Sequence, residues 1–143
     1  MSAPAAILET ALYAADLDAA EGFYGGLLGL ERVTRAGERH VFFRCGAGML
    51  LIFNPAETRR PPGGGPPVPP HGAEGPGHVC FAATPAELDA WRRRIEAAGL
   101  AVEADFRWPN GARSLYLRDP AGNSVEFAEP RLWAEKQETK TVA

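Results

Sequence analysis

Glu126 is the polar residue whose position in this sequence says most about chemistry. It lies between Val125 and Phe127 in a strand-like run, and because side chains alternate along a strand, it faces the opposite way to both neighbours. A carboxylate that is removed from water needs a partner. We therefore predict that Glu126 points into a pocket formed by the sheet that contains it.

Four more side chains fall on two shared strand faces. Glu9 and Tyr13 are four residues apart in one strand-like run, and His78 and Cys80 are two apart in another. Tyr13 is a candidate for substrate binding, whereas Cys80 is either a thiol in the pocket or, by default, a buried and inert cysteine. A histidine in an apolar strand is more often a hydrogen-bonded structural side chain, so His78 alone carries little weight.

The run before Glu126 holds further candidates. The stretch Trp108–Gly111 has the composition of a β-turn, and Trp108 either flanks the mouth of a pocket or packs against its neighbours. Arg113 and Tyr116 come next in a strand-like run and could hold an anionic substrate. His71 lies in a segment rich in proline and glycine, where an ordinary solvated histidine is the prediction and a lid residue is the alternative.

The composition is that of a globular protein and limits the classes of partner. The chain has 143 residues, of which 45% are hydrophobic and 23% charged, and its formal net charge is −3. An acidic chain without a large basic cluster argues against binding nucleic acid or a membrane surface. Two cysteines do not make a disulfide framework, and no apolar run is long enough to span a bilayer, so we expect a cytoplasmic protein with reduced thiols.

The segment from Ala56 to Gly77 separates two halves of the chain. Its prolines fix φ and remove hydrogen-bond donors, and the three glycines at 63–65 loosen the backbone. No helix or central strand is expected there. Long connections of this kind are functional lids or plain linkers, and a linker is the prediction here.

The two halves have the same pattern of elements. In the first half, apolar residues recur at helical spacing over Asp18–Leu28, and Gly29 ends the helix. In the second half, Thr84 offers a capping box for a helix over Pro85–Ala98, which Gly99 ends. The two glycines are 70 residues apart (99 − 29). The pattern therefore indicates an internal repeat.

Strand-like runs fill the rest of both halves. One run precedes each helix and three come after it, which makes each half a βαβββ module. A module of this length cannot bury its helix and a sheet face alone. The predicted fold class is therefore α+β, with two βαβββ modules paired, edge to edge or through a partner chain, into a curved, cupped mixed sheet with the helices outside. The predicted strands are Ile7–Tyr13, Glu31–Thr34, His40–Cys45, Met49–Phe53, His78–Ala82, Ala101–Phe106, Arg113–Arg118 and Ser124–Ala128.

Four stretches carry a resemblance to a known family: Glu9–Leu17, Phe23–Leu30, Gly77–Ala82 and Asp119–Phe127. In this order they resemble the vicinal oxygen chelate superfamily, which includes glyoxalases, bleomycin resistance proteins and extradiol dioxygenases. The first two look like its opening module, and the third looks like the first strand of its second module. The fourth is similar to its signature turn and last strand, because Asp-Pro-x-Gly-Asn demands a tight turn before an alternating strand.

The resemblance implies one glyoxalase-like domain over residues 1–143. Module one would span residues 5–55 and module two residues 78–130, joined by a Pro/Gly-rich linker over 56–77 and followed by a C-terminal tail over 131–143. Small members of the superfamily are usually two-fold dimers, so the resemblance also implies a homodimer. In many members, the first module of one chain faces the second module of the other.

Most enzymes of the superfamily hold one divalent metal ion with residues from the first and last strands of each module. Carried over by position, these ligand places are Glu9, Leu51, His78 and Glu126. A leucine cannot bind a metal, so the four-ligand arrangement of glyoxalase I is absent, and Glu9 stands where related enzymes have a histidine. The resemblance thus implies a site of Glu9, His78 and Glu126 for a divalent ion such as Mn, Fe, Ni or Zn.

Two functions from different classes emerge as predictions. The first is a metal-dependent lyase, isomerase or oxygenase that acts on a small oxygen-rich substrate. The second is a metal-free protein, similar to the bleomycin resistance proteins, that sequesters an aromatic or cationic compound; the incomplete ligand set keeps it open. For the enzyme, the catalytic candidates are Glu9, as a base if it is not a ligand, and Tyr116, and the substrate-binding candidates are Tyr13, Trp108 and Arg113.

Overall fold

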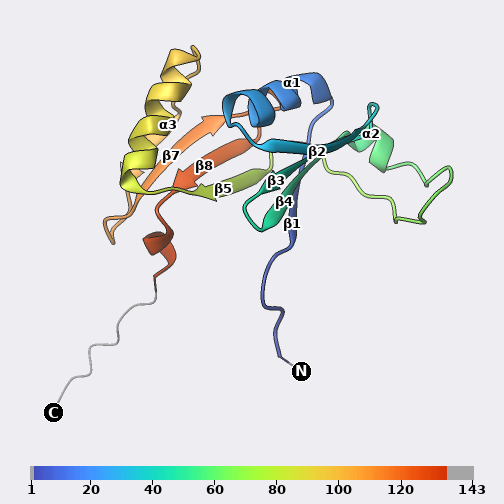
Figure 1. Cartoon of the computed structure of the whole chain (residues 1–143), viewed down its shortest axis with the longest axis horizontal. Coiled ribbons are helices and arrows are strands. Elements are labelled where there is room, and N and C mark those ends of the chain that lie inside the picture. Colours follow the sequence, from blue (N-terminus) through green and yellow to red (C-terminus); the bar gives the residue numbers. More distant parts are fainter. Residues whose placement is uncertain (1, 135–143) are drawn as a thin grey trace. The chain divides into compact units, whose positions relative to one another are not determined.

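The computed structural model describes residues 2–134, which divide into two compact units. The first unit runs up to Val79 and includes Leu117–Val125, and the second comprises Cys80–Tyr116 and the residues from Glu126 onward. Figure 1 shows the elements along the chain. Between residues 2 and 134, no helix is both long enough and apolar enough to cross a membrane.

The strands form two separate four-stranded sheets with the same internal order. One sheet has the order β1-β4-β3-β2 and the other β5-β8-β7-β6. In the first sheet β1 runs parallel to β4, whereas β3 is antiparallel to both of its neighbours. The predicted α+β class and the repeated βαβββ order are confirmed. The strands are β1 (Glu9–Tyr13), β2 (Glu31–Ala36), β3 (His40–Cys45), β4 (Gly48–Phe53), β5 (His78–Ala82), β6 (Ala104–Arg107), β7 (Arg113–Arg118) and β8 (Ser124–Ala128).

The first helix begins one residue before its predicted start at Asp18 and changes its winding. The α-helix α1 (Leu17–Glu21) is capped by Asp16, which accepts a hydrogen bond from the backbone N–H of Ala19 at 3.0 Å. It continues as a π-helix, η1 (Gly22–Leu27), where the Leu28 N–H donates to the carbonyl five residues back, at 2.9 Å. A pure α-helix over 18–28 is therefore not what forms.

This helix covers one face of the first sheet. Tyr24 is fully buried, and its ring lies 6.0 Å from that of Phe43 in β3. Along β3 and β4 the residues on the same face are also buried, which makes this the core of the first unit. They are Val41, Phe43, Leu50 and Ile52.

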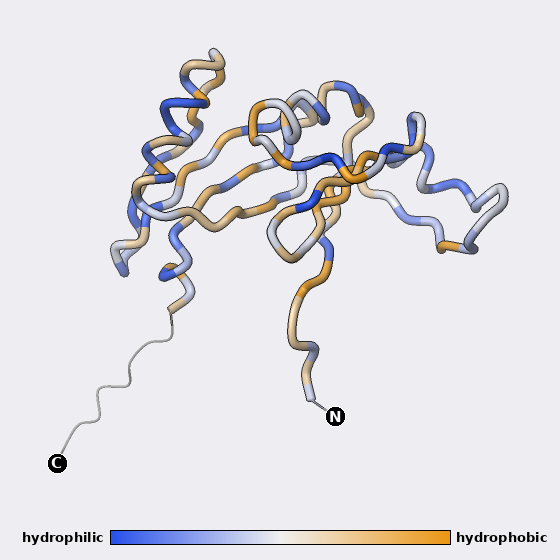
Figure 2. Tube along the Cα trace, viewed as in Figure 1, coloured by the Kyte–Doolittle hydropathy of each residue, from blue (hydrophilic) through white to orange (hydrophobic). Residues whose placement is uncertain are grey.

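The second helix, α3 (Pro85–Ala97), has the predicted capping box. The Glu87 N–H donates to the Thr84 hydroxyl at 3.2 Å, and the Thr84 N–H donates to the Glu87 carboxylate at 3.1 Å. Hydrophilic and hydrophobic stretches alternate along the helix in Figure 2. Its apolar side packs on the second sheet, where Trp91 stacks on Phe127 with ring centroids 4.6 Å apart.

The Asp-Pro-x-Gly-Asn turn, residues 119–123, forms a buried hydrogen-bonded cluster inside the first unit. The Asp119 carboxylate accepts from the Asn123 N–H at 2.8 Å and from the Tyr24 hydroxyl at 2.7 Å. The Asn123 amide in turn donates to the Tyr13 carbonyl at 3.1 Å and accepts from the Gly77 N–H at 2.7 Å. Burial, together with the charge of Asp119, raises the pKa of Tyr24 well above its usual range. The Asp and Asn of the motif are thus needed to join three distant segments.

The Pro/Gly segment contains one element that the sequence prediction excluded. A short helix, α2 (Pro55–Thr58), opens at Asn54, whose side chain accepts from the Ala56 N–H at 3.1 Å. An Asn cap with proline at the first helical position is a helix-start signal, and it outweighs the proline- and glycine-rich composition of the segment. Between Thr58 and His78 there is no further helix or strand, as predicted. A last short 3-10 turn, η2 (Pro130–Trp133), comes after β8.

Candidate functional site

The face of the first sheet opposite the helix lines a cavity of about 600 Å³. Its side chains alternate with those of the core along β1, β3 and β4. The other wall is the Pro/Gly segment, which passes over this open face. The cavity is lined by Glu9, Arg39, His40, Phe42, Leu51 and Phe53 from the sheet and its β2–β3 turn, and by Pro62, Gly63, Gly64, Pro66, Val68 and His71 from the segment.

Ring side chains give this cavity its flat surfaces. Phe42 stacks on His40 with ring centroids 4.0 Å apart, and it meets Phe53 edge to face at 5.3 Å. From the Pro/Gly segment, His71 meets the Phe53 ring edge to face at 4.5 Å. Such contacts hold each ring in a defined orientation. The cavity therefore presents preformed apolar planes to a ligand.

Residues 59–77, here called the strap, are tied to the sheet through His71. The His71 ring nitrogen Nδ1 is 2.7 Å from the Tyr13 hydroxyl, and the His71 backbone N–H donates to the Thr58 carbonyl at 2.9 Å. Arg59 and Glu74 add an ion pair of 2.9 Å between the two ends of the strap. His71 is half-buried, so the prediction of an ordinary solvated histidine is wrong. The predicted role of Tyr13 in substrate binding stays a prediction.

Arg39 and His40 form the polar corner of the cavity. One Arg39 nitrogen, Nη1, is 2.6 Å from His40 Nδ1, and its guanidinium carbon lies 5.8 Å from the centre of the Phe53 ring. Burial and then the charge of Arg39 lower the pKa of His40, so this imidazole is neutral at pH 7. Because Nδ1 accepts the hydrogen bond from Arg39, we assign the ring proton to Nε2.

In the second unit, Glu126 is buried next to a thiol and a phenol. Partial burial, together with the charge and hydrogen bonding of Glu126, raises the pKa of Cys80 to about 12, although the residue as a whole is exposed. Burial and Glu126 likewise raise the pKa of Tyr116 to about 12. Both groups stay protonated near neutral pH and act as donors toward the carboxylate. The burial expected for Glu126 is present, with 5% of the residue exposed.

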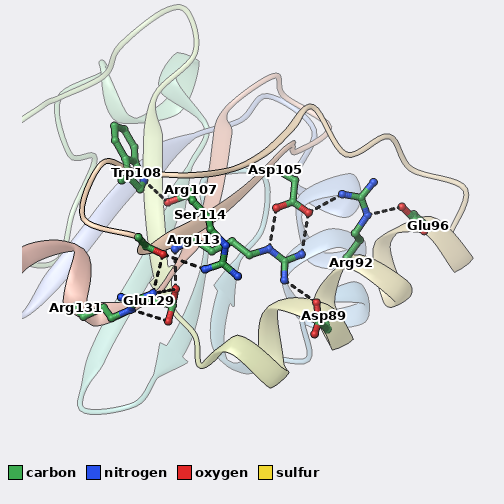
Figure 3. Close-up of polar contacts among 11 residues, drawn as sticks. Asp89, Arg92, Glu96, Asp105, Arg107, Trp108, Arg113, Ser114, Glu129 and Arg131 are labelled. Atoms are coloured by element: carbon green, nitrogen blue, oxygen red, sulfur yellow. Dashed lines mark hydrogen bonds and ion pairs between the residues drawn. The ribbon is translucent and has the colours of Figure 1, made fainter.

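Trp108 and Tyr116, both predicted to belong to a site, lie in one aromatic cluster of the second unit. The Trp108 Nε1–H donates to the Ser114 hydroxyl at 2.7 Å, as Figure 3 shows. The Phe106 ring stacks parallel to Tyr116 at 5.8 Å and meets Trp108 edge to face at 4.9 Å. Trp108 thus packs against neighbours, which was one of its two predicted roles, and its part in substrate binding stays a prediction.

Arg113 lies on the other face of its strand, in an ion network with helix α3. Its guanidinium contacts the Asp105 carboxylate through two bonds of 2.8 Å and Asp89 through one of 2.6 Å (Figure 3). Arg92 contacts Asp105 as well, at 2.6 Å. The hydrogen bonds of Arg113 lower the pKa of Asp105 to about 2. A guanidinium held by two carboxylates favours a structural role over the predicted contact with an anionic substrate.

The predicted metal ligands have different surroundings. His78 is exposed at the start of β5, and its Nδ1 is 3.0 Å from the Ser124 carbonyl. If Nδ1 carries the proton of that bond, Nε2 keeps its lone pair, which is the arrangement found in metal-binding histidines. Glu9 is exposed at the start of β1 and lines the cavity of the first unit, whereas Glu126 belongs to the second unit.

A complete set of metal donors is not found within residues 2–134. That part of the chain holds no group of three or more His, Cys, Asp or Glu side chains that could bind an ion. Leu51, at the fourth predicted ligand place, is buried and offers no donor. The donors within either unit do not fit a metal ion by themselves. The set of Glu9, His78 and Glu126 therefore stays a prediction.

The sequence prediction missed most residues of the cavity, although one signal was available. The resemblance assigns Leu51 to a predicted ligand place, which marks its side of β4 as the open face, and Phe53 is two residues further along the same strand. In the register of β3 with β4, Phe42 is opposite Leu51 and His40 is opposite Phe53. The alternation of side chains between the two faces of a strand therefore identifies these rings once the strand pairing is known. Arg39, in a turn, carries no such signal.

Comparison with known proteins agrees with this architecture. A family model of the Glyoxalase/Bleomycin resistance protein/Dioxygenase superfamily matches residues 6–127. A crystal structure described as lactoylglutathione lyase from Agrobacterium tumefaciens is 54% identical to this chain, with a TM-score of 0.88 over 92% of this chain and 98% of that one.

Two further relatives are more distant. Protein PA2024 of Pseudomonas aeruginosa, described as uncharacterized, is 35% identical over 128 residues, which is 82% of this chain and 84% of the relative. A crystal structure of a glyoxalase/bleomycin resistance protein/dioxygenase from Nocardioides is 24% identical, with a TM-score of 0.70 over 90% of this chain and 85% of that one. The Nocardioides structure supports the fold alone.

Proposed function

Because the chain belongs to the glyoxalase/bleomycin resistance protein/dioxygenase superfamily, we propose that it binds a small organic molecule in the cavity of its first unit. The observation that carries the proposal is the set of oriented rings around a space of about 600 Å³. Small-molecule sites are concave, largely apolar and preformed, with a few polar groups that fix orientation. This cavity combines those features, so its ligand has a flat, apolar part.

The strap supports the same function. It is a long segment rich in proline and glycine, yet His71 holds it over the open face through a ring contact and a hydrogen bond. Covering the cavity shields a ligand from water, and the few contacts of the strap let it open for entry. This function corresponds to that of the sequestering members of the superfamily, which bind a compound without transforming it.

Ring removal tests the proposal. Phe42→Leu keeps an apolar side chain of similar size but removes one flat wall, so the affinity for a planar ligand should fall about tenfold, as for loss of one aromatic contact. Calorimetry with a panel of planar compounds measures it. Phe106→Leu is the control, because Phe106 is an aromatic residue of a strand that does not line this cavity. Equal affinities of the parent and Phe42→Leu, or a parent that binds no planar compound, would refute the proposal.

The second candidate is an enzyme, and one comparison favours it. The Agrobacterium tumefaciens structure that is 54% identical to this chain is described as a lactoylglutathione lyase. The superfamily implies a divalent metal ion, for which Glu9, His78 and Glu126 are the predicted ligands. Metal analysis of the purified protein, and then an assay of lactoylglutathione lyase activity with the metal-supplemented protein, separates the two candidates. If the protein is metal-free and inactive but still binds planar compounds, the enzyme candidate is rejected and the binding function remains.

A further inference from the structure

Arg39 brings a positive charge to the cavity and forms no ion pair with a carboxylate of the described residues. Within residues 2–134 the polar contact of its guanidinium is with the neutral His40 ring, at 2.6 Å. Arg59, the first residue of the strap, is by contrast paired with Glu74 at 2.9 Å. A half-buried guanidinium next to aromatic walls is a site prepared for an anion.

His40 adds a second donor beside the guanidinium. Since its Nδ1 accepts from Arg39, the proton on Nε2 remains available to a ligand oxygen. One fixed positive charge and one neutral N–H suit a singly charged carboxylate. A phosphate dianion would need a second cation, and within the cavity lining Arg39 is the single lysine or arginine.

The one acidic residue of the cavity fixes the direction of the ligand. Glu9 and Tyr13 are the two ends of β1, and the strand register places Tyr13 opposite Phe53, which is opposite His40. Glu9 is therefore four residues along β1 from the row formed by Tyr13, Phe53 and His40, which is about 13 Å at the rise per residue of a strand. An anionic group is attracted to the Arg39 end and repelled from the Glu9 end.

Resting on the proposed binding function, we infer that the ligand of this cavity is an aromatic or conjugated monocarboxylate. Its carboxylate binds Arg39 and His40, and its planar part lies among the rings of Phe42, Phe53 and His71. The strap covers the ion pair and lowers the local dielectric constant, which strengthens it. A cationic compound, included in the sequence-based prediction of a sequestering protein, does not suit this charge arrangement.

The test compares matched ligands on the full chain. Benzoate, cinnamate and 2-naphthoate are titrated by calorimetry against the corresponding amides and alcohols, which keep the ring but lose the charge. We expect the tightest carboxylate to bind about 10- to 100-fold better than its amide, as for a charge-assisted hydrogen bond in a sheltered site. Arg39→Gln should remove that preference, and Arg39→Lys should keep part of it. Arg44→Gln, in the neighbouring strand β3 but outside the cavity lining, is the control and should change neither affinity.

The outcomes separate the two proposals. If acids, amides and alcohols bind equally, or if Arg39→Gln keeps the preference, the carboxylate inference is overturned while the binding function stands. If none of the three scaffolds binds in any form, both proposals fail. Inorganic phosphate that displaces 2-naphthoate at equal concentration would also overturn the carboxylate assignment, because it would reveal a site for a more highly charged anion.

Discussion

Partial burial and the charge of Glu126 together keep the two groups beside this carboxylate protonated. Partial burial and then Glu126 raise the pKa of both Cys80 and Tyr116 to about 12. A thiol with a raised pKa is a poor nucleophile, and a phenol with a raised pKa can donate a proton but not remove one at neutral pH. If Tyr116 is catalytic, as the sequence predicts, it therefore acts as a donor.

Replacing Glu126 should make Cys80 more reactive. In Glu126→Gln the negative charge is lost, so the pKa of the Cys80 thiol falls and its thiolate fraction at pH 8–9 rises. The rate of alkylation by iodoacetamide should increase about tenfold or more, since one pKa unit changes the thiolate population tenfold. The experiment uses a Cys45→Ser background, so that Cys80 is the only thiol. A rate unchanged by Glu126→Gln across this pH range would contradict the charge effect.

Metal content tests the predicted ligands individually. His78→Ala and Glu126→Ala should each abolish uptake of Mn, Fe, Ni or Zn if the predicted site exists, because a three-ligand site does not survive loss of one donor. Glu9→Gln should weaken uptake if Glu9 is a ligand and leave it largely intact if Glu9 is a base. His71→Ala is a histidine control outside the predicted set. A parent protein without metal after growth with all four ions would reject the ligand set.

The network around Asp105 fixes strand β6 and helix α3 to strand β7. Because hydrogen bonds from Arg113 lower the pKa of Asp105 to about 2, the carboxylate is stabilised in the folded state relative to its ordinary value of 3.8. Its contribution to stability is complete above pH 4 and is lost as the pH falls toward 2. After allowance for solvent screening, this contribution is on the order of 1–2 kcal/mol.

Asp105→Asn should therefore lower the free energy of unfolding by about 1–2 kcal/mol at pH 7 and have little effect at pH 2. Urea unfolding at a series of pH values measures both. Glu96→Gln, which touches the same network only through the exposed Arg92, is the control and should stay within about 0.5 kcal/mol of the parent. An equal loss at pH 2 and pH 7 would show that Asp105 acts through packing rather than charge.

The hold of the strap on the sheet depends on the Tyr13 hydroxyl. Tyr13→Phe removes the 2.7 Å bond to His71 but keeps the ring, so local opening of the strap should become easier by about 1 kcal/mol. Hydrogen exchange at the His71 amide, which donates to Thr58, should accelerate about fivefold. Tyr116→Phe, in the second unit, is the matched control. Exchange as slow as in the parent would mean that the ring contacts alone hold the strap.

Local signals predicted most elements because each is decided by neighbouring residues. The Thr84 capping box and the glycine that ends α3 are contained within one helix, and the structure confirms them. The π-helix η1 was not predictable in this way, since it depends on the contacts of Tyr24 with Phe43 and Asp119. The strap was underestimated for the same reason. Its composition says that no sheet forms, but its anchoring at Tyr13 is a contact across 58 residues.

The binding site required knowledge of strand register, which spacing in the sequence does not supply. The alternation around Glu126 sufficed to predict its burial, because it needs only one strand. The cavity of the first unit, in contrast, combines three strands, a turn and the strap. Residues of that kind become visible only after pairing is known. This explains why Arg39, on which the proposed ligand class depends, was absent from the sequence-based candidates.

For the whole molecule, the remaining prediction is a homodimer. Large apolar side chains stay exposed in each unit of the single chain, including Leu8 with 73% and Trp133 with 86% of the residue accessible. The family resemblance implies a two-fold dimer, the commonest symmetric assembly, and exposed apolar side chains of this size are candidates for its interface. Sedimentation equilibrium at micromolar concentration should therefore give twice the 15.3 kDa of one chain.

Leu8→Glu should shift the equilibrium toward monomer by at least tenfold, because a charge would be buried in the interface, whereas Val68→Glu in the strap should not. A parent that sediments as a monomer would reject the dimer, and a dimer unaffected by Leu8→Glu would place the interface away from the start of β1.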